Sequence, residues 1–137
     1  MPSETKWYVE GRVSSVRDWG DLTVEEMRET NRVFLEHIRG GTPPVHLLID
    51  TRAIGKLPGS FITMLKEIEA FRHEANMGWT LMVTNNSLLH FFGTLSSNLL
   101  KMPFKAVSSY EEVNAVLKRV DPSLEGLLPE KWDAASI

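Results

Sequence analysis

Cysteine is absent from the 137 residues, and its absence removes several kinds of chemistry at once. Disulfides, thiolate nucleophiles and cysteine-ligated zinc or iron–sulfur sites are all excluded. The four histidines stand far apart in the sequence and form no i, i+4 pair of the kind that holds zinc on a helix. We therefore expect neither a metal ion nor any other cofactor.

The sequence also lacks an excess of positive charge and a long hydrophobic run. The formal net charge is −3, and no run of Lys and Arg could form a basic stripe for nucleic acid. No stretch approaches the roughly 18 apolar residues of a membrane span, and the polar N-terminal residues lack the apolar segment of a signal peptide. These observations predict a cytoplasmic protein with no membrane span and no nucleic-acid partner.

Sequence motifs for catalysis or nucleotide binding are missing as well. No Gly-x-Ser-x-Gly turn is present, and the glycines around Ser60 do not bracket it as a nucleophilic serine requires. The segment 55–59 lacks the Lys-Ser/Thr ending of a phosphate-binding loop, and no G-x-G-x-x-G occurs. The sequence therefore predicts a protein that is not an enzyme.

What is present is the composition of one ordinary globular domain. Hydrophobic residues make up 42% and charged residues 24%, which is enough to build a core without disulfides. We expect a single domain over residues 1–137, with its core at about 6–120. The segment 121–137 carries Leu127, Leu128 and Trp132 without periodicity, so we expect a loosely packed C-terminal extension there.

Strand and helix patterns alternate along the chain. Thr23 with Glu26 and Ser109 with Glu112 have the spacing of helix-capping boxes, and helical or strand periodicity marks the remaining elements. Short connections between alternating strands and helices imply a mostly parallel sheet. Residues 6–10 and 12–19 are expected to form two strands or one bent strand. The other expected strands are 45–50, 79–83 and 104–107, and the expected helices are 23–39, 60–73, 88–100 and 109–120.

This order resembles the STAS superfamily, and most closely its SpoIIAA-like branch, named after an anti-sigma factor antagonist. The resemblance rests on a helix that begins after Gly-Asp-Leu-Thr (20–23), on the strand ending Leu-Leu-Ile-Asp (47–50), and on the three βα units that follow. It implies an α/β fold with a four- to five-stranded, mostly parallel or mixed sheet flanked by about four helices. It also implies an interaction module without catalysis.

The antagonists of this branch carry a serine that a partner kinase phosphorylates, preceded by an aspartate. Counted from Asp50, that position falls on Gly59, and Ser60 follows it without an acidic neighbour. We therefore do not expect a phosphorylation switch in this loop.

The carboxyl ends of the strands are the expected binding edge, because ligands of open α/β sheets bind there, next to helix N-termini. The candidate binding residues at this edge are Asp50, Arg52, Ser60, Thr84 and Asn85. Simple N-capping explains Ser60 equally well, and a local salt bridge explains Asp50 with Arg52.

The helix at 88–100 is apolar in almost every direction around its axis. One sheet cannot cover all of its faces, so it is covered by the chain's own core, a second subunit, a partner or an apolar ligand. We assign Phe92, with Leu89 and Ser96, to the outer face, where it would be a binding residue in a homodimer.

Three functions follow from the sequence. The leading hypothesis is a regulatory or interaction module without catalysis that docks to a protein partner or to itself. The alternative is a carrier or sensor of a small apolar or lipid-like ligand, with the helix at 88–100 as a wall of its pocket. An enzyme that uses Asp50, Arg52 and a loop serine is the least favoured.

Overall fold

The computed structural model describes residues 3–57 and 59–129, which form five strands, four α-helices and one short 3₁₀ helix. Strands and helices alternate after an opening strand pair, as the sequence predicts. The strands are β1 Ser3–Val9, β2 Val13–Gly20, β3 Val45–Ile54, β4 Met77–Val83 and β5 Phe104–Val107; the helices are α1 Val24–Gly40, α2 Phe61–Glu69, α3 Ser87–Leu100, α4 Tyr110–Val120 and the 3₁₀ turn η1 Pro122–Leu124.

The five strands form one mixed sheet in the order β1-β2-β3-β4-β5. β1 and β2 pair antiparallel, whereas β2, β3, β4 and β5 run parallel to one another. The parallel pairs require crossover connections, which α1, α2 and α3 provide. The expected α/β fold with a mixed five-stranded sheet and four helices is therefore confirmed.

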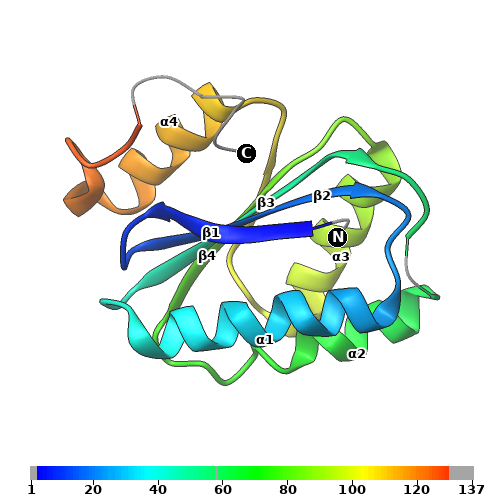
Figure 1. Cartoon of the computed structure of the whole chain (residues 1–137). Helices are drawn as coiled ribbons and strands as arrows, with labels where there is room; N and C mark the ends of the chain where they lie inside the picture. The colour runs from blue at the N-terminus through cyan, green and yellow to red at the C-terminus, as the bar shows by residue number, and fades with distance from the viewer. Residues whose placement is uncertain (1–2, 58, 130–137) are drawn as a thin grey trace.

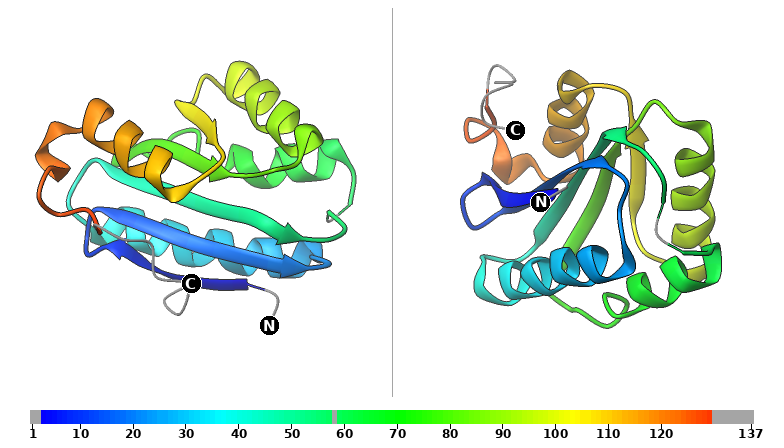
Figure 2. Two further views of the ribbon diagram at one scale, coloured as in Figure 1. Left: turned by 90° about the horizontal axis from the view of Figure 1, so that it is seen from above. Right: turned by 45° about the vertical axis from the view of Figure 1, so that its right-hand side comes forward.

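Helices cover both faces of this sheet (Figure 1). α4 lies against one face, where Val113 and Leu117 pack with Leu48 of β3. α1 lies against the other face, where Phe34 and Ile38 pack with β3. α2 contacts α1 and α3, and α3 packs beside β5, so three helices surround the face opposite α4 (Figure 2).

The helices begin where the capping residues in the sequence predict. Thr23 and Glu26 form the complete capping box of α1, and each side chain accepts a hydrogen bond from the other's backbone N–H. Ser60 and Ser109 cap α2 and α4 through their hydroxyl groups. These side chains satisfy backbone donors that the helix itself leaves without partners.

β3 is longer than the apolar run that identifies it in the sequence. It continues for four residues beyond Asp50, because β2 runs alongside and pairs its last residue, Gly20, with Ile54. Asp50 and Arg52 therefore lie within the strand, and their expected place in a loop after it is wrong. The neighbouring strand supplies hydrogen-bond partners that no local pattern in the sequence reveals.

The C-terminal segment is anchored to the core by a buried polar cluster. Nε2 of His46 lies 2.8 Å from Asp121 Oδ2, and Arg12 forms an ion pair with the same carboxylate at 3.0 Å. Burial alone would raise the pKa of Asp121, but hydrogen bonds from Ser123 and His46 and the charges of His46 and Arg12 lower it. Asp121 is therefore held as a carboxylate at the end of α4.

Leu124 follows this cluster and is completely buried against the α4 face of the sheet. Leu128 packs against the same part of the hydrophobic core as Leu124. The carbonyl oxygen of Pro129 accepts a hydrogen bond from Asn114. Leu124 and Leu128 therefore attach the segment 122–129 to the core, whereas Leu127 is 53% exposed. Trp132 lies outside the described residues.

Across residues 3–57 and 59–129, none of the helices has the combined length and apolar character needed to cross a bilayer.

Candidate functional site

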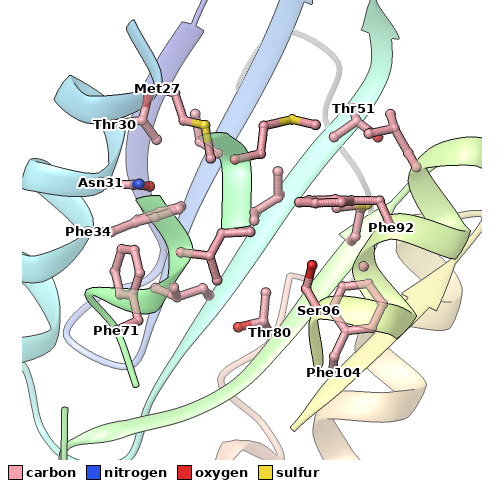
Figure 3. Close-up of a pocket in the computed structure, with 18 of the residues that line it drawn as sticks. Met27, Thr30, Asn31, Phe34, Thr51, Phe71, Thr80, Phe92, Ser96 and Phe104 are labelled. Carbon is pink, nitrogen blue, oxygen red and sulfur yellow. The ribbon is translucent and has the colours of Figure 1, made fainter. Parts of the chain in front are cut away.

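A cavity of about 160 Å³ lies between the sheet and the three helices α1, α2 and α3 (Figure 3). Its floor is formed by side chains of β2, β3 and β4 that point away from α4, among them Val16, Leu47 and Ile49. The helices form its walls, and Phe34 of α1 faces Phe92 of α3 across the space (Figure 3). The sheet and all three helices therefore contribute to one cavity.

The lining is almost entirely apolar and rich in methionine. Five of the six methionines in the sequence line the cavity, together with four phenylalanines. Methionine side chains are unbranched and polarisable, so they adapt to ligands of different shape. The residues are Met27, Met64, Met77, Met82, Met102, Phe34, Phe71, Phe92 and Phe104.

Close packing at β5 sets one end of the cavity. The ring of Phe104 lies directly on Gly93 of α3, and a Cβ atom at Gly93 would stand 2.2 Å from Cζ of that ring. Only glycine permits this approach of helix and ring. Gly93 therefore allows Phe104 to close this end of the cavity.

Polar residues of the helices line the cavity on opposite sides, among them Asn31 of α1 and Ser96 of α3. Asn31 of α1 donates a hydrogen bond of 3.4 Å from Nδ2 to the carbonyl oxygen of Glu67 in α2. Ser96 of α3 is 4% exposed, and its hydroxyl, which points into the cavity, has no hydrogen-bond partner among the described residues (Figure 3). A buried hydroxyl without a partner is costly, and a bound molecule would supply one.

Two acidic residues, Asp18 of β2 and Glu26 of α1, are also among the residues that line the cavity. Asp18 is 7% exposed, and burial, reinforced by the negative charges of Asp50 and Glu26, raises its pKa to about 7. Glu26 Oε1 is held by the backbone N–H of Thr23 in the capping box. Asp18 therefore changes its charge near neutral pH inside an apolar space.

Asp50 and Arg52 lie on the opposite face of the sheet from the cavity, where Asp50 is held by α4. Arg52 donates two side-chain hydrogen bonds to the Asp50 carboxylate, and the hydroxyl of Tyr110 donates a third. The Arg52 guanidinium also lies 5.3 Å from the centre of the Tyr110 ring. Its hydrogen bond to Asp50 is the main cause that raises the pKa of Arg52. This geometry is that of the local salt bridge, which is one of the two explanations that the sequence allows for Asp50 and Arg52.

The remaining polar residues of the expected binding edge have local structural roles or face solvent. Ser60 is the N-cap of α2 and accepts a hydrogen bond from the backbone N–H of Thr63. The hydroxyl of Thr84 accepts one from the backbone N–H of Asn86, which caps α3. Asn85 is exposed. Asp50, Arg52, Ser60, Thr84 and Asn85 therefore do not converge on one pocket, although binding at this edge stays a prediction.

Phe92 does face a binding space, but the assignment of its helix face is wrong. Phe92 is 7% exposed, and with Leu89 and Ser96 it lines the cavity rather than the outer surface. The rings of Phe92 and of Phe61 in α2 pack edge to face, with their centroids 5.0 Å apart. The sequence shows a helix that is apolar all round, and only the packing decides which face turns inward.

The outer face of α3 carries a different set of side chains. Leu88, Phe91 and Leu99 are 63%, 61% and 54% exposed, and Leu95 is half-buried between them. These positions follow an i, i+3, i+7, i+11 spacing and so form one stripe along the helix. We call Leu88, Phe91, Leu95 and Leu99 the outer stripe.

Ser14 and His37 have the residue types of a catalytic serine–histidine dyad, but the serine is not accessible to a substrate. The hydroxyl of Ser14 contacts Nδ1 of His37, whose ring stacks on Trp7 with centroids 4.2 Å apart. Burial lowers the pKa of His37. Ser14 has no exposed surface, so a substrate cannot reach its oxygen. Among residues 3–57 and 59–129, no group of three His, Asp or Glu side chains is placed to hold a metal ion.

Comparison with known proteins supports the fold. No family model matches the sequence, and no curated protein matches it. A crystal structure from Shewanella loihica PV-4, described as an uncharacterised protein of the DUF3478 family with a SpoIIAA-like fold, superposes with a TM-score of 0.61. That alignment covers 84% of this chain and 91% of the other at 14% identity. The chain therefore has a SpoIIAA-like fold, as its resemblance to STAS domains implies.

The cavity itself has no signature in the sequence, whereas two of its polar residues, Asp18 and Ser96, have weak ones. Asp18 stands between the strand residues Val16 and Trp19 and could be recognised only as a carboxylate in an otherwise mostly buried strand. Ser96 follows Leu89 and Phe92 on one helical face, which marks it as a polar residue among apolar ones. Both signals are visible in the sequence, but neither shows that the two residues share a space.

Proposed function

We propose that this protein is a binding module without catalytic activity that holds a small, largely apolar molecule in the cavity between the sheet and α1, α2 and α3. The observation that carries the proposal is the cavity itself. At about 160 Å³ it is slightly larger than an engineered apolar cavity of about 150 Å³ that is known to bind benzene.

The side chains around the cavity indicate a binding site rather than a packing defect in the core. Protein interiors are close-packed, and voids larger than one water molecule are few. Here the void is bounded by five methionines, which adjust their shape to an occupant more readily than branched side chains do. The fold is consistent with this role, since a SpoIIAA-like fold suggests a regulatory or interaction module.

Docking to a protein partner or to a second copy of the chain is the second candidate function. It is favoured by the outer stripe of α3, whose large apolar side chains are exposed. Such stripes are typical of helices that pack against another surface. The two functions are compatible, because α3 lines the cavity with one face and presents the outer stripe with the other. A ligand in the cavity would thus contact the helix that meets the partner.

Toluene is a suitable first probe of the cavity, because it is apolar and only slightly larger than benzene. If the cavity is a binding site, toluene at ten times its dissociation constant stabilises the fold by about 1.4 kcal/mol. Thermal unfolding with and without toluene measures this, and native mass spectrometry of the purified protein detects any molecule retained from the cell. Absence of both a thermal shift and a retained molecule would contradict the proposal.

A matched pair of variants places the binding in the cavity. Ser96→Leu extends a side chain into the cavity and removes the hydroxyl without a partner, so it should abolish the effect of toluene. Asn98→Leu adds a leucine on the exposed side of the same helix and should leave the effect unchanged. Circular dichroism checks that both variants fold. Equal toluene binding by wild type and Ser96→Leu would place the probe elsewhere.

A further inference from the structure

The charged side chains of the cavity have one sign only. Asp18 and Glu26 line it at the side of β2 and α1, and none of the described lining residues is Lys, Arg or His. A bound carboxylate or phosphate would bring a further negative charge into an apolar space without a cationic partner. That arrangement is strongly unfavourable, whereas a cation would be paired there.

Two further features suit a cation with an apolar body. Four phenylalanine rings line the cavity, and the faces of aromatic rings attract an ammonium group. The buried hydroxyl of Ser96, on the α3 side, has no hydrogen-bond partner among residues 3–57 and 59–129, and it is independent of the acidic pair. It points into the cavity, where it can bond a second polar atom of the ligand (Figure 3).

We propose that the cavity selects a small primary amine with an apolar body, whose ammonium group pairs with Asp18 beside Glu26. This inference rests on the proposed binding function and specifies the chemical class of the ligand. Neutral molecules of the same shape bind more weakly, because they leave the carboxylate without a partner. Carboxylic acids of the same shape are rejected.

Amine binding is coupled to the charge of Asp18. Burial, with the nearby negative charges of Asp50 and Glu26, raises the pKa of Asp18 to about 7, and Asp50 is itself paired with Arg52. A primary amine stays protonated through neutral pH, as the lysine side chain does. The ammonium ion therefore binds best when Asp18 is ionised, and its affinity rises about tenfold between pH 6 and pH 8.

Three probes of similar size separate the chemical classes: benzylamine, benzyl alcohol and benzoate. Isothermal titration at pH 8 should give a dissociation constant for benzylamine at least tenfold lower than that for benzyl alcohol, and no detectable binding of benzoate. Asp18→Asn should weaken benzylamine binding tenfold or more, remove its pH dependence and leave benzyl alcohol unaffected.

Glu25→Gln is the matched control, because it removes one negative charge from the first turn of α1 at an exposed position outside the cavity. This variant should keep the preference for benzylamine. Equal binding of the three probes, or tighter binding of benzyl alcohol or benzoate, would overturn the amine preference while the binding function stands. Failure of all three probes and of toluene would overturn the proposed function as well.

Discussion

Asp18 is the residue at which burial and charge act most strongly against each other. Its side chain is buried, and the charges that act on its carboxyl group, those of Asp50 and Glu26, are also negative. The folded protein therefore binds a proton at Asp18 up to about pH 7, whereas an unfolded aspartate loses its proton near pH 3.9. Between these two values the folded state holds more protons than the unfolded state.

We predict that Asp18 makes the protein less stable as pH rises from 4 to 7. The stability of the folded state with Asp18 protonated, relative to that with Asp18 ionised, is the quantity that changes. This stabilisation is fully present below about pH 4, is lost progressively up to pH 7, and amounts to as much as about 4 kcal/mol. Asp18→Asn keeps the size of the side chain and removes the ionisation. The variant should be more stable than wild type by about 1–3 kcal/mol at pH 8 and similar to it at pH 4.

Urea unfolding at the two pH values measures this difference. Comparison of the two proteins at each pH cancels the titration of all other groups. A difference between variant and wild type that is the same at pH 4 and pH 8 would show that the charge of Asp18 is not the cause.

At the scale of elements, β3 is the strand on which both halves of the core depend. It is the central strand of the sheet, and its successive side chains point to opposite faces. Leu48 is fully buried on the α4 side, while Ile49 lines the cavity and is only half-buried. The expectation of a strand covered on two faces is confirmed, but the two faces are not packed equally well.

We predict different costs for truncating the two neighbours. Leu48→Ala leaves a new cavity in a close-packed region and should lower the free energy of unfolding by about 2–5 kcal/mol. Ile49→Ala only enlarges a space that already exists, so its cost should lie at the low end of that range or below it. Chemical denaturation of both variants gives the comparison. A larger loss for Ile49→Ala than for Leu48→Ala would mean that the cavity side is the better packed one.

At the scale of the whole molecule, the outer stripe of α3 bears on the oligomeric state. If a second copy covers the stripe, the contact repeats the same patch on both subunits. Phe91 lies in the middle of the stripe and is 61% exposed in the single chain. A charge at this position would oppose the contact and leave the fold of the single chain intact.

We therefore predict that the wild type is a homodimer and that Phe91→Glu yields folded monomers. Sedimentation velocity gives the mass, and circular dichroism the fold. Thr94→Glu, at an exposed position of the same helix outside the stripe, is the control and should stay dimeric. A monomeric wild type would assign the stripe to a different partner and would contradict the homodimer.

The sequence alone determined the order and type of the elements, because these depend on local chemistry. Thr23, Ser60 and Ser109 cap the helices that the pattern predicts, and their hydroxyl groups need only backbone donors three residues away. The mainly apolar run 45–49 identified the central strand, because a strand covered on both faces carries mainly apolar side chains; its one polar residue, His46, is buried with Asp121 as its partner.

Only the tertiary structure decided which side chains meet. The sequence pattern ends a strand at Asp50, but pairing with β2 extends the strand, and Asp50 accepts a hydrogen bond from Tyr110 of α4. The sequence pattern assigns Phe92 to the outer face of its helix, but packing on the sheet turns it into the cavity. Asp18 and Ser96 share that cavity although 78 positions separate them in the sequence. A cavity is a volume that distant elements leave unfilled, so no local pattern in the sequence encodes it.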